Sequence, residues 1–204
     1  MNNVVVGVVD YGIGNISSVI NCIRRLGFRT KIGDNPESLE DTDLLVIPGV
    51  GAFPAAMQAL HNRGFVNFLR QKAFDDHPII GICLGMQLLT STSCEYKNTD
   101  GLGIIPGSVI ALNEPNWHIG WNTLNHLIPV PFITNTKHDT FYFNHSFCYS
   151  GPSKYHVSVA YTPDPVVAII RSNKVVGFQF HPEKSQDAGS CLFKDYILEL
   201  TSCV

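Results

Sequence analysis

Short apolar runs alternate with helical patterns along the first half of the chain. Runs rich in branched aliphatic residues, as expected of strands buried on both faces, cover residues 4–9, 44–47 and 79–82. Between and after them, apolar residues recur at helical spacing and predict helices from residue 16 to Gly27 and over residues 55–62, 65–73 and 84–89. This order predicts an α/β fold with a doubly wound, mostly parallel sheet.

The pattern changes after about residue 101, where glycine, proline and aromatic residues become frequent and the apolar runs shorten. Residues 140–143 are expected to form a strand, and residues 166–170 and 175–180 a hairpin around residues 172–174. Apolar residues from Leu192 to Leu200 have helical spacing and predict a final helix packed on the sheet. We therefore expect one domain over residues 1–204, with an irregular, β-rich second half that covers one end.

Composition narrows the class of protein. The 204 residues are 45% hydrophobic, and the formal net charge of -3 gives no electrostatic reason to expect nucleic acid or an acidic membrane as a partner. No stretch approaches the roughly 18 apolar residues that span a bilayer. The six cysteines contain no C-x-x-C pair and are expected to be reduced thiols of a cytoplasmic protein. We expect neither a metal nor a cofactor.

A cysteine stands where the third apolar run meets a helical pattern. The segment Gly81-Ile82-Cys83-Leu84-Gly85 has the pattern G-x-C-x-G, the thiol counterpart of a nucleophile elbow. An elbow strains its central residue, and a Cβ on either glycine would strike the neighbouring strand or helix. Cys83 is then exposed at the carboxyl end of the sheet, where a helix N-terminus favours a thiolate and the Leu84 N–H can bind an oxyanion. A hydrolase elbow and a buried core cysteine remain alternatives.

A histidine and a glutamate follow another predicted strand. His181 ends that strand and Glu183 comes two residues later, so both share a face if the chain is extended. Glu183 can then accept from the imidazole while the other ring nitrogen faces the thiol, which is the arrangement of a base and its orienting acid. In α/β-hydrolases the acid precedes the histidine, so this chain order argues against them. Alone, the pair also fits a surface histidine at a strand end.

A glycine-flanked turn follows the second apolar run. Residues 48–53 read Pro-Gly-Val-Gly-Ala-Phe and present backbone N–H groups at the sheet edge where Cys83 is expected. The N–H of Gly51 is the candidate for a second oxyanion donor, a contribution worth roughly 10²–10³ in rate. Taken alone, the segment also fits an ordinary tight turn.

Together these segments resemble the class I, or triad-type, glutamine amidotransferases. The matching strings occur in order over most of the chain, at residues 10–15, 48–53, 81–87, 118–122, 142–146 and 179–185. The set is most similar to one branch, the glutaminase subunits of imidazole glycerol phosphate synthases of histidine biosynthesis. The most specific strings are His-Ile-Gly-Trp-Asn and His-Pro-Glu-Lys-Ser. The resemblance implies the flavodoxin-like fold of that family.

The resemblance also implies a reaction. Cys83 attacks the side-chain amide carbon of L-glutamine, and protonated His181 gives a proton to the leaving ammonia. Water then releases glutamate from the thioester. The oxyanion is held by the amides of Leu84 and Gly51. The substrate is held by Gln87, His145 and Ser146, although these three side chains also fit structural roles.

A protein partner follows from the same resemblance. In the family the ammonia passes through a channel to a separate (β/α)₈ cyclase subunit, and a chain of 204 residues has no room for that second activity. We expect a heterodimer in which the cyclase covers the mouth of the site. Its candidate contacts are Asn15, Trp121 and Lys184.

One position departs from the family pattern. Trp117 stands where the family usually has proline before His118, in a segment near the partner interface. The alternative within the family is a paralogous glutaminase that supplies ammonia for amidino groups on surface polysaccharide. From other classes, the alternatives are a catalytically inactive, flavodoxin-like binding domain and a cysteine hydrolase acting on esters or small lactones.

Overall fold

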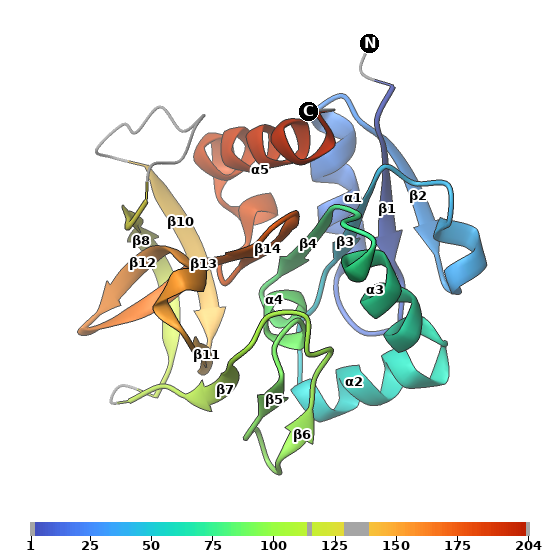
Figure 1. Cartoon of the computed structure of the whole chain (residues 1–204). Coiled ribbons are helices and arrows are strands. Elements are labelled where there is room, and N and C mark those ends of the chain that lie inside the picture. Colours follow the sequence, from blue (N-terminus) through green and yellow to red (C-terminus); the bar gives the residue numbers. More distant parts are fainter. Residues whose placement is uncertain (1–2, 114–115, 129–138, 203–204) are drawn as a thin grey trace.

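A computed structural model describes residues 3–113, 116–128 and 139–202 (Figure 1). Its main sheet consists, in spatial order, of β2 (Arg29–Gly33), β1 (Val5–Val9), β3 (Leu44–Ile47), β4 (Ile79–Ile82), β14 (Val175–Phe178), β13 (Asp164–Ser172), β12 (His156–Thr162) and β9 (Asn125–His126). The strands from β2 to β14 are parallel to their neighbours, and those from β14 to β9 are antiparallel. The predicted mostly parallel, doubly wound sheet is confirmed.

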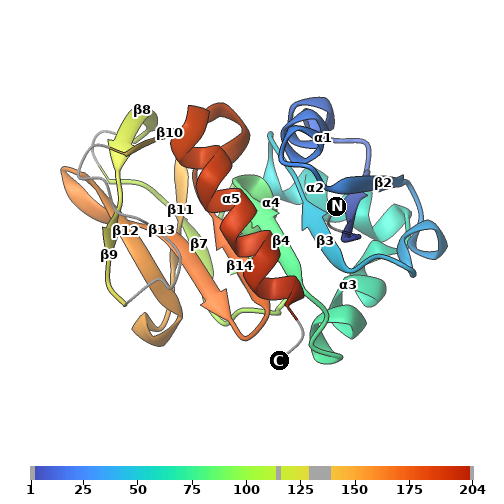
Figure 2. The same cartoon turned by 90° about the horizontal axis from the view of Figure 1, so that it is seen from above.

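Helices cover both faces of the parallel strands. They are α1 (Ile16–Arg25) and α5 (Gln186–Thr201) on one face, α2 (Phe53–Asn62) and α3 (Phe65–Phe74) on the other, and α4 (Leu84–Leu88) directly after β4. Seen from above, α1 and α3 lie on opposite sides of the strands (Figure 2). Successive side chains of a strand point to opposite faces, so Leu44 and Val46 of β3 pack into one core, and Leu45 and Ile47 into the other. The continuous apolar runs therefore serve two cores.

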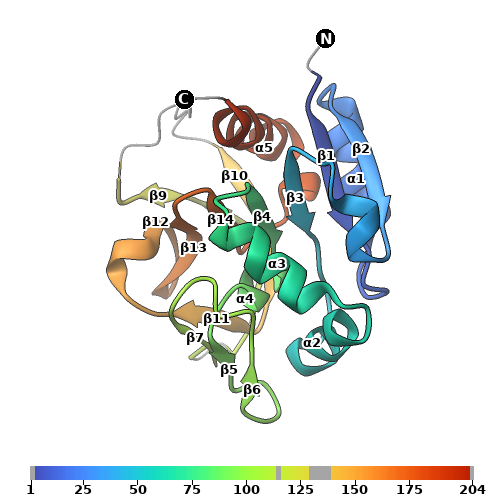
Figure 3. The same cartoon turned by 45° about the vertical axis from the view of Figure 1, so that its right-hand side comes forward.

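In its described residues, the second half adds two small sheets. One pairs β8 (His118–Thr123) with β10 (Thr140–His145). The other contains, in order, β11 (Phe147–Ser150), β7 (Ser108–Ala111), β5 (Thr92–Ser93) and β6 (Thr99–Asp100). The described residues also include the short 3₁₀ turns η1 (Pro36–Leu39), η2 (Ser153–Tyr155) and η3 (Pro182–Lys184). Figure 3 shows α4 between the parallel strands and the four-stranded sheet. The predicted β-rich second half is thus present at the carboxyl end of β4.

The main differences from the predicted elements have simple causes. The sequence pattern did not indicate β2, because this edge strand leaves most of its residues exposed and has no apolar run. Several boundaries differ by one or two residues: β1 begins at Val5, α2 begins at Phe53 and β14 ends at Phe178. Strand and helix ends depend on the surrounding hydrogen bonds, which a pattern of apolar residues does not encode.

Within the described ranges, no helix is long and apolar enough to cross a membrane. In the same ranges, no three His, Cys, Asp or Glu side chains are grouped so that they could hold a metal ion. The described cysteines are free thiols, as expected, and Cys203 lies outside the described residues.

Candidate active site

The elbow predicted at Cys83 is present between β4 and α4. Cys83 has φ 54° and ψ -108°, a strained conformation for a residue with a side chain. A Cβ on Gly81 would lie 2.6 Å from the carbonyl oxygen of Gly85, and a Cβ on Gly85 would overlap the carbonyl oxygen of Ile47 in β3. The two glycines therefore allow α4 to pack directly on the sheet, as predicted.

The exposure predicted for Cys83 is wrong. The residue is only 6% exposed, because segments of the second half lie over the carboxyl end of β4. Its Sγ is 3.9 Å from the main-chain oxygen of Asn144, which lies in β10. An elbow in an open α/β sheet raises its side chain above the strands, but the covering segments then enclose it.

Cys83 lines a cavity of about 340 Å³. This volume is near the lower end of the range of about 300–1,000 Å³ for small-molecule sites, which suits an amino acid. The cavity brings together all the residues predicted to form the oxyanion hole and to bind substrate, namely Gly51, Leu84, Gln87, His145 and Ser146. It is completed by Val50, Glu95, Tyr96, Asn144 and Phe147.

His181 and Glu183 form the predicted pair. Nδ1 of His181 donates to Oε1 of Glu183 at 2.9 Å, and the two side chains are 3% and 4% exposed. The reason predicted for this contact is wrong, because β14 ends before His181 and the pair is brought together by the turn η3 rather than by an extended chain. Pro182 occupies the first position of that turn.

The second ring nitrogen of His181 is available for chemistry. Nε2 is buried and makes no hydrogen bond to the described residues. Burial alone would lower the pKa of His181, but the side chains of Cys83 and Glu183 outweigh it and raise that pKa to about 9. The imidazole of His181 therefore carries a proton at neutral pH.

Strand β10 holds the His181 segment in place. The N–H of His181 donates to the main-chain oxygen of Tyr142 at 2.9 Å, and the N–H of Tyr142 donates to Oγ of Ser185 at 2.9 Å. The same hydroxyl donates to the main-chain oxygen of His181 at 2.6 Å. His181 is thus positioned by a strand of the second half.

The turn that contains Gly51 is held by a hydrogen bond from a buried tyrosine. The hydroxyl of Tyr11 donates to the main-chain oxygen of Pro48 at 2.7 Å, and Tyr11 is 2% exposed. Gly51 has φ 110°, a conformation that side chains rarely adopt. Burial, with a smaller effect of Cys83, raises the pKa of the Tyr11 phenol, so this donor keeps its proton.

Two residues of the site had no role assigned from the sequence. Glu95, which is 7% exposed, lines the cavity and accepts from the N–H of Phe53 at 2.8 Å. Gln179 is fully buried, and its Nε2 lies 4.0 Å from Sγ of Cys83. Gln179 belongs to one of the family strings, which was a usable signal. Glu95 stands in no motif, so only the fold reveals it.

The residues predicted to contact a partner lie near His181 or near the turn that contains it. The ring of Trp121, which is 48% exposed, is 5.8 Å from that of Tyr142, and Nζ of Lys184 is 5.8 Å from the same Tyr142 ring. The ring of Tyr142 is in turn 6.5 Å from that of His181. Asn15 is exposed at the start of α1, a helix that contacts η3.

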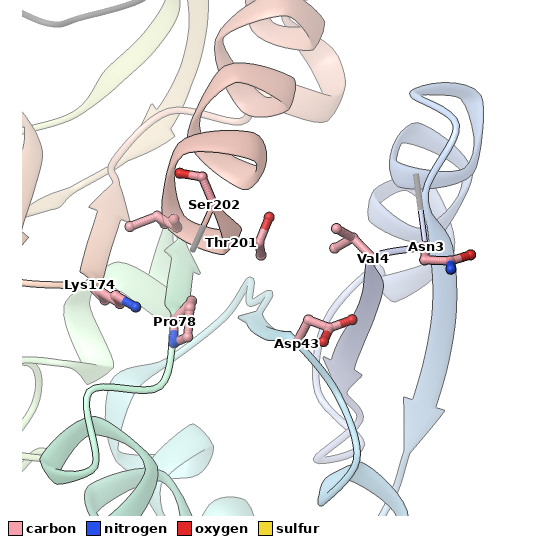
Figure 4. Close-up of a pocket in the computed structure, with 8 residues that line it drawn as sticks. Asn3, Val4, Asp43, Pro78, Lys174, Thr201 and Ser202 are labelled. Carbon is pink, nitrogen blue, oxygen red and sulfur yellow. The ribbon is translucent and has the colours of Figure 1, made fainter. Parts of the chain in front are cut away.

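A second cavity, of about 330 Å³, lies at the amino ends of the parallel strands, opposite the end with Cys83. Figure 4 shows residues from the amino ends of β1 and β4 together with the last turn of α5. Lys174 and Asp43 are its charged residues, and its lining contains neither a cysteine nor a histidine. The cavity with Cys83 is the candidate active site, because its lining contains the cysteine of the elbow and His145.

Comparisons with known proteins agree with this geometry. The chain matches the family model "Glutamine amidotransferase class-I" over residues 7–199. It is 36% identical over 202 residues to the imidazole glycerol phosphate synthase subunit HisH of Streptococcus sanguinis, covering 96% of this chain and 98% of that protein. The subunit of the same name from Lactococcus lactis is 38% identical over 197 residues, covering 95% of this chain and 98% of that protein.

Solved structures share the fold. A structure described as a glutamine amidotransferase aligns with a TM-score of 0.73 at 20% identity, covering 96% of this chain and 98% of that one. The structure of PurLQS from Thermotoga maritima aligns with a TM-score of 0.74 at 18% identity, covering 97% of this chain and 99% of that one.

Proposed function

Since the chain belongs to the class I glutamine amidotransferases, which hydrolyse glutamine, we propose that it is the glutaminase subunit of an imidazole glycerol phosphate synthase. In histidine biosynthesis it would supply the ammonia that closes the imidazole ring. The observation that carries the proposal is the 36% identity over 202 residues to a subunit of that name. The buried pair of His181 and Glu183 beside a strained Cys83 provides the chemistry.

Acylation begins with the thiolate of Cys83, which attacks the side-chain amide carbon of glutamine. The carbonyl electrons move to oxygen, and the N–H groups of Leu84 and Gly51 hold the resulting oxyanion. Both residues line the same cavity as Cys83. The tetrahedral intermediate collapses, the C–N bond breaks, and Nε2 of His181 protonates the nitrogen that leaves as ammonia.

Deacylation uses the same groups in reverse order. Neutral His181 accepts a proton from water, whose oxygen attacks the thioester carbon, and the C–S bond breaks to release glutamate. Glu183 accepts from Nδ1 in both steps and so keeps Nε2 directed at the reacting atoms.

Two side chains of the cavity can recognise the rest of the glutamine. Among the described residues that line it, Glu95 is the only carboxylate, and a carboxylate suits the α-ammonium group. Gln87 uses Nε2 for bonds to the main-chain oxygen of Phe147 at 2.9 Å and to Oε1 of Gln179 at 3.2 Å. Its Oε1 remains to accept a hydrogen bond from substrate.

The partner we propose is a (β/α)₈ cyclase that docks over Trp121, Tyr142 and Lys184. The ring of Tyr142 lies next to that of His181, and Trp121 and Lys184 lie next to Tyr142, so a subunit seated on them is close to the group that protonates the leaving ammonia. Docking there also makes hydrolysis dependent on the partner, because the cyclase contacts the residues that hold the base.

Measurement of glutamate release tests this function. The wild-type chain is expected to hydrolyse glutamine slowly alone and at least tenfold faster with the cyclase subunit of the histidine pathway. Cys83→Ala should abolish the activity, while Cys191→Ala, which removes an exposed thiol on α5, should leave it unchanged. Unchanged glutamine hydrolysis in Cys83→Ala would show that the thiol is not the nucleophile.

Trp117 supports a second candidate partner. Its side chain is 52% exposed next to His118, at a position where the family usually has proline. A paralogous complex that uses the ammonia for amidino groups of surface polysaccharide would keep the same glutaminase site. Formation of imidazole glycerol phosphate by the reconstituted complex decides for the histidine pathway, and its absence despite partner-stimulated glutamate release decides against it.

A further inference from the structure

Two buried histidines face each other across the strand pair β8–β10. His118 and His145 are direct cross-strand partners, and Nδ1 of His118 is 3.0 Å from Nε2 of His145. The two residues are 7% and 8% exposed, and the ring of His118 stacks on Phe143 at 4.3 Å. His145 lines the cavity with Cys83, whereas His118 does not. The pair therefore connects β8 to the wall of the site.

Backbone carbonyls at both ends determine where the protons lie. Nδ1 of His145 is 2.9 Å from the main-chain oxygen of Phe147, which can only accept, so Nδ1 carries the proton and Nε2 accepts from His118. At the other end, Nδ2 of Asn122 donates to the main-chain oxygen of Tyr161 at 2.9 Å and to Nε2 of His118 at 3.3 Å. Both histidines are therefore neutral and protonated at Nδ1. Burial lowers the pKa of His118 to about 4 and, as the largest cause, that of His145 to about 3.

The same chain of hydrogen bonds continues to the nucleophile. The oxygen of Phe147 also accepts from Nε2 of Gln87 at 2.9 Å, and the second proton of that amide goes to Oε1 of Gln179 at 3.2 Å. Since Oε1 of Gln179 accepts, its Nε2 points a donor at Sγ of Cys83, 4.0 Å away. A chain of hydrogen bonds with defined donors and acceptors thus connects His118 in β8 to Sγ of Cys83.

The opposite face of β8 is exposed. Along this strand His118 and Asn122 point inward, whereas Ile119 and Trp121 are 55% and 48% exposed. Trp121 belongs to the surface on which we place the cyclase. One short strand therefore carries partner contacts on one face and the start of the hydrogen-bond path on the other.

We propose that His118 is a positioning residue for glutamine hydrolysis, which acts through His145 on the Phe147 carbonyl and so orients Gln87 and Gln179 beside Cys83. This role rests on the proposed function and adds to it the route by which docking at β8 reaches the thiol. Without the Nδ1 proton of His118, the buried Nε2 of His145 loses its donor. The ring of His145 is then held less firmly, and so is the Phe147 carbonyl to which its Nδ1 donates.

The kinetic test compares three variants of the full chain in complex with the cyclase subunit. His118→Leu is expected to lower kcat/KM for glutamine about tenfold, the effect of one buried hydrogen bond. His118→Asn, whose amide can donate from the place of Nδ1, should retain activity within threefold of wild type. The control His156→Leu removes a hydrogen bond to Gly151 away from the site and should change kcat/KM less than twofold. The Kd of the cyclase should stay within threefold in all variants.

A second measurement keeps the proposal testable if His118→Leu does not fold. Nitrogen-15 NMR of the isolated wild-type chain at pH 7 should show both histidines neutral and protonated at Nδ1. A proton on Nε2 of either ring, wild-type kcat/KM in a folded His118→Leu, or equal losses in the Leu and Asn variants would overturn the proposal. The outcomes also separate it from the proposed function. Absence of His118 effects in a complex that hydrolyses glutamine refutes the positioning role alone, whereas absence of glutamate release by wild type refutes both.

Discussion

At the scale of single residues, the site depends on one strained cysteine and one buried ion pair. Cys83 has a positive φ at the sharp turn from strand β4 into helix α4. His181 keeps a proton because Glu183 and Cys83 outweigh the cost of burying its charge. In the proposed mechanism, His181 thus already holds the proton that the leaving ammonia needs before substrate binds.

The pKa of His181 predicts how activity depends on pH. It is raised from 6.5 to about 9, so the proton needed by the leaving ammonia is present at neutral pH and lost as the pH rises through about 9. The corresponding contribution to folding stability is fully present below about pH 6.5 and lost between there and about pH 9. Glu183→Gln should lower that pKa, move the alkaline limb of kcat/KM to lower pH, and reduce kcat by roughly 10²–10⁴.

Measurement of kcat/KM from pH 6 to 10 checks this prediction. Glu199→Gln is the matched control. Glu199 lies near the C-terminal end of α5, and its carboxylate pairs with Arg171 of β13. This substitution should leave the alkaline limb in place. An unchanged limb in Glu183→Gln would mean that Glu183 does not set the protonation of His181.

At the scale of elements, the elbow needs two glycines for two different contacts. Gly81 faces the backbone of α4, and Gly85 faces the carbonyl of Ile47 in β3. A G-x-C-x-G string therefore predicts both the turn and the close packing of α4 on the sheet. This explains why the string was informative although α4 spans only Leu84–Leu88.

Substitution of Gly85 by alanine tests this packing. The new Cβ would overlap the main-chain oxygen of Ile47, and we expect Gly85→Ala to destabilise the fold by about 2–4 kcal/mol and to displace Cys83. Gly103→Ala is the control, because open space surrounds Gly103 and only its φ of 66° opposes a side chain, at a cost of about 1 kcal/mol. Urea unfolding measures the free energy of unfolding of both variants. Equal losses of this free energy would contradict the close contact proposed at Gly85.

At the scale of the whole molecule, the second half supplies what the parallel sheet lacks. It covers Cys83, holds His181 through Tyr142 and places Trp121 against the ring of Tyr142. In the proposed mechanism the nucleophile thus stands directly after strand β4 and its base at the start of the turn η3, whereas their cover and the proposed partner surface come from the added β structure.

The proposed docking surface predicts one large effect on assembly. Trp121→Ala should weaken binding of the cyclase at least tenfold, because half-exposed aromatic residues commonly dominate such interfaces. Phe74→Ala is the control. This ring is 86% exposed at the end of α3, a helix that supplies no residue to the candidate interface. Calorimetric titration measures both. Similar affinities for Trp121→Ala and wild type would place the partner elsewhere.

The sequence by itself determined the parallel sheet, the elbow and the pairing of His181 with Glu183. These features depend on local patterns, namely buried apolar runs, glycines at fixed spacing and two side chains close in the chain. Only the tertiary structure decided that Cys83 is covered, that Glu95 faces the cavity and that His118 joins His145. Those contacts join residues distant in sequence through short, irregular strands, and a local pattern carries no information about such pairs.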